Sequence, residues 1–80
     1  FLRNTGFLGL EFSGNIVVMH TRPGYAAGIT TEIDSHRFET ICGTLAGDDT
    51  ILAIMREGVD RQQVIDELAV VLPAVKSILL

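Results

Sequence analysis

The chain has 80 residues, of which 48% are hydrophobic, and its formal net charge is −4. Six scattered basic residues in an acidic chain do not form the basic stripe that neutralises phosphates, so we expect no direct binding to nucleic acid. The apolar runs are shorter than the roughly 18 residues that span a bilayer, and nothing resembles a signal peptide. We expect one soluble, cytoplasmic domain over residues 1–80, which is part of a longer protein or a processed form because no initiator Met is present.

The first part of the chain is typical of a β-hairpin followed by a helix. Two apolar stretches, residues 7–12 and 16–21, flank a cluster of turn-forming residues at 13–15. Residues 25–35 then carry apolar side chains on one side at helical spacing, which predicts a short amphipathic helix. Pro23 suits the first turn of that helix because proline lacks an N–H.

The next part of the chain predicts a second pair of strands. We expect a third strand over residues 37–45, a tight turn at 46–48 and a fourth strand over 50–55. The second and fourth strands lack polar alternation, so both faces of each are apolar. Because two helices cannot cover both faces of a sheet, another copy of the chain is the economical cover, and we infer a homo-oligomer.

A second helix follows. Asp60, with Gln63 three residues on, predicts a capping box at its start, and Pro73 predicts its end or a kink. Its apolar stripe consists of Val64, Ile65, Leu68, Val71 and Leu72. Residues 74–80 are expected to form a further helical turn or a docked strand. The order β-β-α-β-β-α predicts an α+β two-layer sandwich, in which two helices cover one face of a four-stranded antiparallel sheet.

The polar feature that most clearly indicates a binding site is the pair of adjacent carboxylates Asp48 and Asp49, at the turn of the second hairpin. Carboxylates so placed can receive a guanidinium or an ammonium through charge-assisted hydrogen bonds. The pair alone, however, favours the simpler interpretation of a turn that ends in solvent. Asp34 and His36 could join the pair as metal ligands, but no spacing typical of a zinc or calcium site is present, and we expect no metal.

Catalytic patterns are missing from the sequence. His20 and His36 have no obvious nucleophile partner, and no Gly-x-Ser-x-Gly, Walker or Gly-x-Gly-x-x-Gly motif occurs, so we expect no enzyme and no cofactor. The single cysteine, Cys42, lies among apolar neighbours and is expected to be buried in the core. Arg22 and Arg37 flank the first helix and are expected to form surface or interface pairs.

The run Gly43-Thr44-Leu45-Ala46-Gly47-Asp48-Asp49-Thr50-Ile51 closely resembles the signature of the C-terminal domain of bacterial arginine repressors. Residues 17–24, which end in Thr-Arg-Pro-Gly, resemble a strand of the same family, and Asp34 falls where the family carries an aspartate. The β-β-α-β-β-α order also agrees. The resemblance covers essentially the whole chain and is most specific at residues 16–34 and 43–51.

The resemblance implies a transcriptional regulator of arginine metabolism, whose N-terminal winged helix-turn-helix domain is absent here and would alone contact operator DNA. It implies trimers that stack into a hexamer, with L-arginine as the effector between the trimers. Asp48 and Asp49 would hold the guanidinium and other charged groups of the ligand. Asp34 would assist at another polar end, and Thr44 and Ala46 would supply backbone contacts.

One position departs from the family pattern. Family members usually carry Gln or Asn in the first helix where this chain has Ala27, and that amide contributes to the arginine pocket. Loss of a buried hydrogen-bond partner commonly costs about 1–3 kcal/mol. Weaker arginine binding, a substituting water molecule or a different ligand are open alternatives, and Thr30 and Thr31 are candidates to compensate. The rival interpretation is a module that assembles without ligand control.

Overall fold

The computed structural model describes residues 6–76 and contains four strands, two α-helices and one short 3₁₀ helix. In chain order these are β1 (Phe7–Ser13), β2 (Ile16–Thr21), α1 (Ala26–His36), β3 (Ile41–Ala46), β4 (Thr50–Met55), α2 (Arg61–Val71) and η2 (Pro73–Lys76). The predicted β-β-α-β-β-α order and fold class are confirmed. The predicted structure for residues 77–80 lies outside the described residues.

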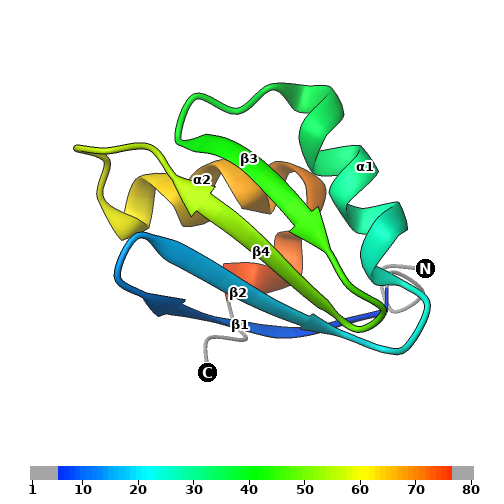
Figure 1. The fold of residues 1–80 in the computed structure, drawn as a ribbon. Coiled ribbons are helices and arrows are strands. Elements are labelled where there is room, and N and C mark those ends of the chain that lie inside the picture. Colours follow the sequence, from blue (N-terminus) through cyan, green and yellow to red (C-terminus); the bar gives the residue numbers. More distant parts are fainter. Residues whose placement is uncertain (1–5, 77–80) are drawn as a thin grey trace.

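The strands form one antiparallel sheet in the order β1-β2-β4-β3, so β2 and β4 are central and β1 and β3 are the edges (Figure 1). Along the central strands, buried and half-buried side chains alternate, so the sheet has two distinct faces. Val17, Met19, Ile51 and Ala53 are fully buried, whereas their neighbours along each strand are half-buried. One face of the sheet therefore lies in the core, and the other faces outward.

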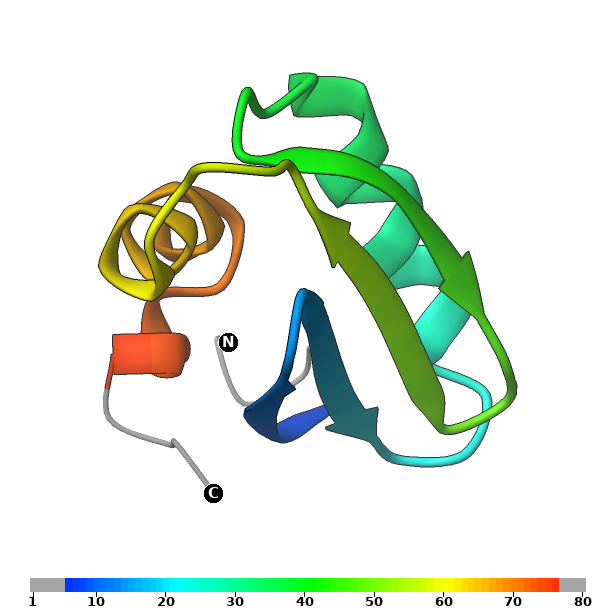
Figure 2. The same cartoon turned by 60° about the vertical axis from the view of Figure 1, so that its left-hand side comes forward.

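Both helices pack on the buried face. Ile33 of α1 and Val64 and Leu68 of α2 belong to the same apolar cluster as Leu10 and Met19 of the sheet. Figure 2 shows α2 nearly along its axis beside the sheet, with α1 alongside β3 and β4. The two-layer arrangement places α1 next to the edge strand β3, where the candidate site is found.

The second helix begins as the sequence predicts. The carboxylate of Asp60 accepts a hydrogen bond from the amide of Gln63, and the side chain of Gln63 accepts one from the amide of Asp60, both at 2.8 Å. This reciprocal pair satisfies two amides that the first turn of a helix leaves without partners. At the other end Pro73 terminates the helix and starts η2, so the expected further helical turn is confirmed over residues 73–76.

Glu67 of α2 ties this helix to the segment before β3. Its carboxylate accepts hydrogen bonds from the hydroxyl of Thr40 at 2.6 Å, the amide of Thr40 at 2.9 Å and the amide of Glu39 at 3.4 Å. Burial raises the pKa of Glu67, but these three hydrogen bonds together lower it more, so the pKa of this carboxyl lies below its usual value. The ionised form is thus the one that the fold favours.

Two predicted boundaries around the first helix are wrong. Pro23 does not lie in the first turn, because Arg22 to Gly24 form a separate turn and the N-cap is Tyr25. The third strand begins at Ile41 rather than at Arg37. Arg37 instead adopts a left-handed conformation (φ 52°) that ends α1, so the chain turns before it can pair with β4.

The prediction that Cys42 is buried is also wrong, because its side chain is exposed. The register of β3 against β4 shifts between Ile41 and Gly43, so Cys42 has no partner residue on β4. A bulge on an edge strand turns the extra residue out of the regular alternation. Cys42 is therefore accessible rather than part of the core.

Neither described helix has the length and apolar character required to cross a membrane.

Candidate ligand site

The site residues that the sequence indicates lie along the boundary between α1 and β3. At one end Asp34, in the last turn of α1, accepts a hydrogen bond of 2.8 Å from the hydroxyl of Thr44 in the middle of β3. Because Thr44 donates to one carboxylate oxygen, the second oxygen of Asp34 stays available to a ligand. Ala46 follows two residues later at the end of β3, where it is half-buried.

At the other end, the loop after β3 is bonded to the segment before α1. The amide of Thr21 donates to the carbonyl of Asp49 at 2.8 Å, and the amide of Gly24 donates to the carbonyl of Asp48 at 2.9 Å. Gly24 has a φ of 86°, a conformation that favours glycine. The two aspartates are therefore held in a fixed position beside the start of α1 by their backbones, and their side chains take no part in this anchoring.

The two carboxylates of this loop are not equivalent. Asp49 accepts a hydrogen bond of 3.0 Å from the hydroxyl of Thr50. Asp48 is exposed, and within residues 6–76 its side chain forms no hydrogen bond and no ion pair. A carboxylate without a partner, on a loop held by its backbone, is suited to receive a cationic group without first breaking a bond.

Ala27 lies in the first turn of α1, and Asp34 follows seven positions later on the same side of the helix, about 10 Å away along its axis. Ala27 is exposed, so a longer side chain has room there. Thr30 is buried, and its hydroxyl donates to backbone carbonyls of its own helix. Thr31 is exposed on the side of Ala27, although its hydroxyl also donates to the carbonyl of Ala27 at 2.9 Å. Of the two threonines, only Thr31 is placed to compensate for a missing amide.

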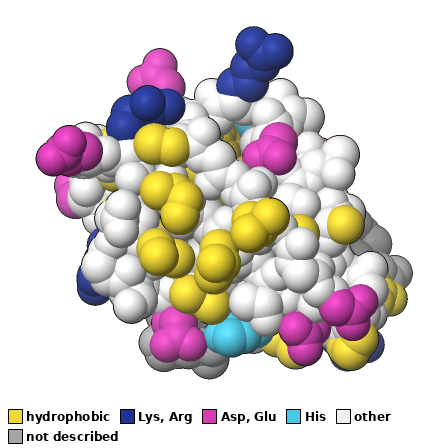
Figure 3. Space-filling model, in the orientation of Figure 1, with side chains coloured by type: hydrophobic (Ala, Val, Ile, Leu, Met, Phe, Trp, Pro, Cys, Tyr) yellow, Lys and Arg dark blue, Asp and Glu magenta, His cyan; other side chains and the backbone are white. Residues whose placement is uncertain are grey.

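The outward face of the sheet carries an apolar patch, which we call the outer-face patch. It comprises Ile16, Val18, Leu45, Leu52 and Ile54, which the strand register places side by side. Leu45 is 69% exposed, and the others are half-buried. Figure 3 shows hydrophobic side chains gathered in the middle of this face. The prediction that both faces of the central strands are apolar is confirmed.

A polar pair borders the outer-face patch. Nε2 of His20 on β2 lies 3.1 Å from a carboxylate oxygen of Glu11 on β1, and Glu11 is the register partner of Val18. His20 therefore has a structural neighbour at the edge of an apolar surface.

Other polar residues that the sequence singles out are not brought together. In the described part of the chain, no group of three or more His, Cys, Asp or Glu side chains is arranged to hold a metal ion. Arg22 and Arg37 form no ion pair with any residue between 6 and 76. The sequence also gave no indication of the backbone contacts of Thr21 and Gly24, since main-chain hydrogen bonds leave no mark in side-chain identity.

An exposed carboxylate loop held against a helix, in a small α+β domain with an apolar sheet face, defines a candidate ligand-sensing and assembly domain rather than a catalytic one. Comparison with known sequences identifies the family. The model of a family described as arginine repressor, C-terminal domain, matches residues 4–69. The chain belongs to this family, whose members are transcription regulators and not enzymes.

Individual proteins similar to this chain carry the same family name. An arginine repressor of Bacteroides thetaiotaomicron is 49% identical over 75 residues, which is 94% of this chain and 48% of that protein. An arginine repressor of Parabacteroides distasonis is 57% identical over 60 residues, 75% of this chain and 41% of that protein. One from Syntrophomonas wolfei is 49% identical over 49 residues, 61% of this chain and 32% of that protein. The chain spans about half the length of the curated relatives it matches.

Proposed function

We propose that this domain senses L-arginine and assembles a cytoplasmic transcriptional regulator of arginine metabolism. The observation that carries the proposal is the free, exposed carboxylate of Asp48 on a loop that Thr21 and Gly24 hold in place. A guanidinium is planar and matches a carboxylate with two parallel hydrogen bonds, which makes this pairing strong and selective over an ammonium. The family to which the chain belongs supports L-arginine as the guanidinium ligand in this proposal.

In this proposal the boundary between α1 and β3 supplies the rest of the pocket. Asp49 receives another charged group of the ligand, and the free oxygen of Asp34 receives a polar end. Thr44 and Ala46 offer backbone groups between them, and Ala27 lines the pocket without donating to the ligand. Because this strip is open to solvent, with exposed aspartates at both ends, a second subunit would complete the pocket, so that the ligand bridges subunits.

The outer-face patch supports self-association. Five neighbouring apolar side chains on one sheet face are a surface that a second copy of the chain can cover, with a gain of roughly 25 cal/mol for each Å² of apolar area removed from water. We propose trimers that pair into a hexamer, with L-arginine between the trimers. Arginine that binds the assembled form more tightly than its parts stabilises the hexamer by mass action.

The remaining half of each longer relative corresponds, in this proposal, to the DNA-binding domain. A hexamer presents several such domains at once, so operator affinity rises through avidity without any new contact. The acidic domain described here would take no direct part in DNA binding, in agreement with its net charge of −4.

Calorimetric titration tests the ligand. L-arginine is expected to release or absorb measurable heat, while citrulline, which lacks the positive charge, and lysine, which lacks the planar fork, bind at least ten-fold more weakly. Asp48→Ala should lose most of the arginine signal, whereas Glu57→Ala, at the opposite end of β4, should retain it. Absence of arginine heat in the wild type, or an unchanged signal in Asp48→Ala, contradicts the proposal.

Ala27 favours a second candidate, an assembly module without ligand control. An alanine at this position offers no side-chain hydrogen bond, and within α1 the neighbour on that side with a hydroxyl is Thr31. This candidate predicts an oligomer whose midpoint of thermal unfolding is the same with and without L-arginine. A concentration-dependent rise with arginine excludes it.

A further inference from the structure

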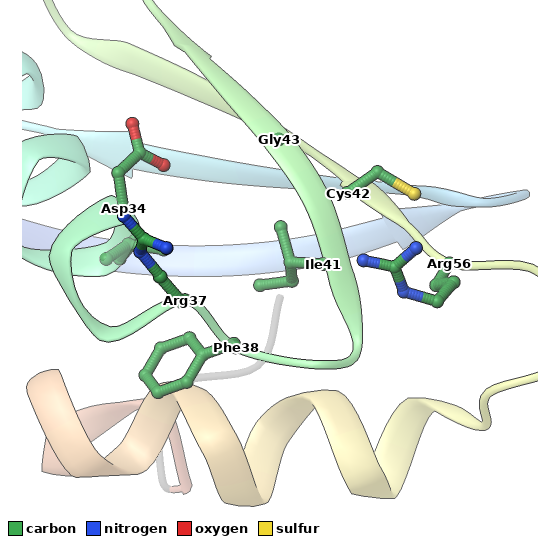
Figure 4. Close-up of a pocket in the computed structure, with 8 residues that line it drawn as sticks. Asp34, Arg37, Phe38, Ile41, Cys42, Gly43 and Arg56 are labelled. Atoms are coloured by element: carbon green, nitrogen blue, oxygen red, sulfur yellow. The ribbon is translucent and has the colours of Figure 1, made fainter.

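A cavity of about 270 Å³ lies beyond the last turn of α1, where β3 begins and β4 ends. Its apolar side is formed by Ile33 and Ile41, which are almost fully buried, and by the half-buried Phe38. Arg37 and Arg56 also line it. Figure 4 shows their guanidinium groups on opposite sides of Ile41, one from each end of the cavity. A mainly polar recess with two guanidinium groups and a small apolar floor is thus separate from the aspartate loop.

Arg56 is held in place with most of its donors free. Its amide donates to the carbonyl of Thr40 at 2.7 Å, and its Nε donates to the carbonyl of Glu39 at 2.8 Å. Glu67 fixes the same segment from α2. No residue within 6–76 accepts a hydrogen bond from the terminal guanidinium nitrogens of Arg56. These nitrogens are therefore preorganised donors at the cavity.

Arg37 occupies a position where glycine is the favoured residue. Its φ of 52° places it in the left-handed region, which L-residues with a side chain enter at a cost. Its side chain forms no hydrogen bond or ion pair with the described residues. A residue that strains the backbone and whose side chain forms no hydrogen bond or ion pair with the described residues is one whose side chain is expected to act on something else.

The charges around the cavity are unbalanced. Asp34 is the one carboxylate among its lining residues, and one of its oxygens already accepts the hydroxyl of Thr44. Two guanidinium groups against one carboxylate leave an excess of one positive charge in a chain whose net charge is −4. An oxyanion in the cavity balances this excess charge and accepts hydrogen bonds from the free donors of the two guanidinium groups.

We propose that this cavity binds a small organic oxyanion, a carboxylate or a phosphate ester with a short apolar body. The oxyanion lies between Arg37 and Arg56, and the apolar body lies against Ile41 and Phe38. A guanidinium fork matches the oxygens of a carboxylate and of a phosphate alike. The site therefore recognises the oxyanion, and it would give the domain a second ligand of charge opposite to that of the guanidinium expected at Asp48.

Titration with two probes tests the site and separates the two sources of the oxyanion. The amides of Cys42 and Gly43 are followed by NMR while succinate or inorganic phosphate is added at constant ionic strength. At least one probe is expected to shift both amides with saturation. Tighter binding of succinate assigns the site to a carboxylate, and tighter binding of phosphate assigns it to a phosphate ester. If neither probe shifts these amides, the proposal is wrong.

Three variants provide the controls. Arg37→Gly removes the guanidinium while it relieves the backbone, so loss of binding in a chain that unfolds at a higher temperature cannot be attributed to misfolding. Arg37→Gly and Arg56→Gln should each weaken binding at least ten-fold, whereas Arg22→Gln, with the same change in charge, should alter it less than two-fold. Equal losses in all three variants indicate general charge attraction and overturn the proposal. A change in the sedimentation of Arg37→Gly in a buffer without carboxylates or phosphates indicates a carboxylate of a second copy in the cavity and also overturns it.

Discussion

The hydroxyl of Thr44 donates a hydrogen bond of 2.8 Å to Oδ1 of Asp34, which joins the middle of the edge strand β3 to the last turn of α1. Two residues that lie ten positions apart in sequence thus form the inner end of the proposed arginine pocket. The bond fixes the carboxylate of Asp34 while leaving its second oxygen available.

Removal of this hydroxyl is the first prediction. Thr44→Val keeps the shape of the side chain, so we expect a loss of about 1 kcal/mol in the free energy of unfolding and weaker arginine binding, because Asp34 is no longer oriented. Urea unfolding and calorimetry measure the two effects. Thr31→Val, which removes a hydroxyl bonded only within its own helix, is the matched control and should affect stability less.

Restoring an amide in the first helix should strengthen arginine binding. Ala27 is exposed in the first turn of α1, so Ala27→Gln fits without displacing the core. A recovered hydrogen bond of about 1.4 kcal/mol corresponds to roughly ten-fold in affinity. Ala27→Met, of similar length but without the amide, separates the hydrogen bond from added contact area. If both variants gain equally, the amide is not the reason.

A charge in the outer-face patch should dissociate the oligomer. Leu52 is half-buried and is the register partner of both Val18 and Leu45, so Leu52→Glu places a carboxylate in the middle of the patch. We expect a smaller sedimentation coefficient with unchanged circular dichroism, because the helices pack on the other face. Val70→Glu, at a side chain 65% exposed on α2, is the control. An intact oligomer in Leu52→Glu would place the interface elsewhere.

The hydrogen bonds to Glu67 predict a pH dependence of stability. Because its pKa is lowered on folding, its ionised form stabilises the fold fully above the unfolded value of about 4.3, and this contribution is lost as the pH falls through the lower folded value. Glu67→Gln should therefore cost about 1 kcal/mol at pH 7, and the difference from the wild type should shrink as the pH falls below the unfolded value and through the lower folded pKa of Glu67. A difference that stays constant over this range would mean that ionisation of Glu67 is unimportant.

Glycine at the end of α1 should stabilise the fold. Arg37→Gly removes the cost of a left-handed conformation, and we expect a gain of about 1 kcal/mol in the free energy of unfolding. Thermal and urea unfolding both measure it. The same exchange at Arg22, which lies in a turn without a positive φ, should not stabilise the chain. A destabilised Arg37→Gly variant would show that the packing of the Arg37 side chain stabilises the fold by more than its left-handed backbone conformation costs.

Much of the fold follows from hydrophobic periodicity and local signals. The bounds of β2 and β4 agree with their apolar, β-branched stretches, and Asp60 with Gln63 predicts the start of α2. The wrong predictions arise where strand pairing in the sheet, rather than local sequence, determines the structure. Cys42 is turned outward by a bulge against β4, and a bulge depends on the partner strand rather than on local sequence. Arg37 is not a residue type that indicates a left-handed cap, so the sequence predicts the start of the third strand four residues too early.

The candidate site is predictable only in part. Asp48 and Asp49 alone do not distinguish a binding loop from a solvent-exposed turn, and the family pattern is what favours the loop. The contact between Thr44 and Asp34 depends on α1 packing alongside β3, which no local spacing encodes. The approach of Arg37 and Arg56 to one cavity has the same origin, since each arginine follows a different element of the fold.

Sedimentation velocity with and without L-arginine tests the central claim most directly. At a fixed protein concentration near the trimer–hexamer midpoint, a saturating amount of L-arginine should shift the boundary toward the hexamer, because arginine binds the assembled form more tightly. Citrulline at the same concentration should not shift it, and Asp48→Ala should lose the response. A boundary that is the same with arginine, with citrulline and without ligand would contradict arginine-controlled assembly.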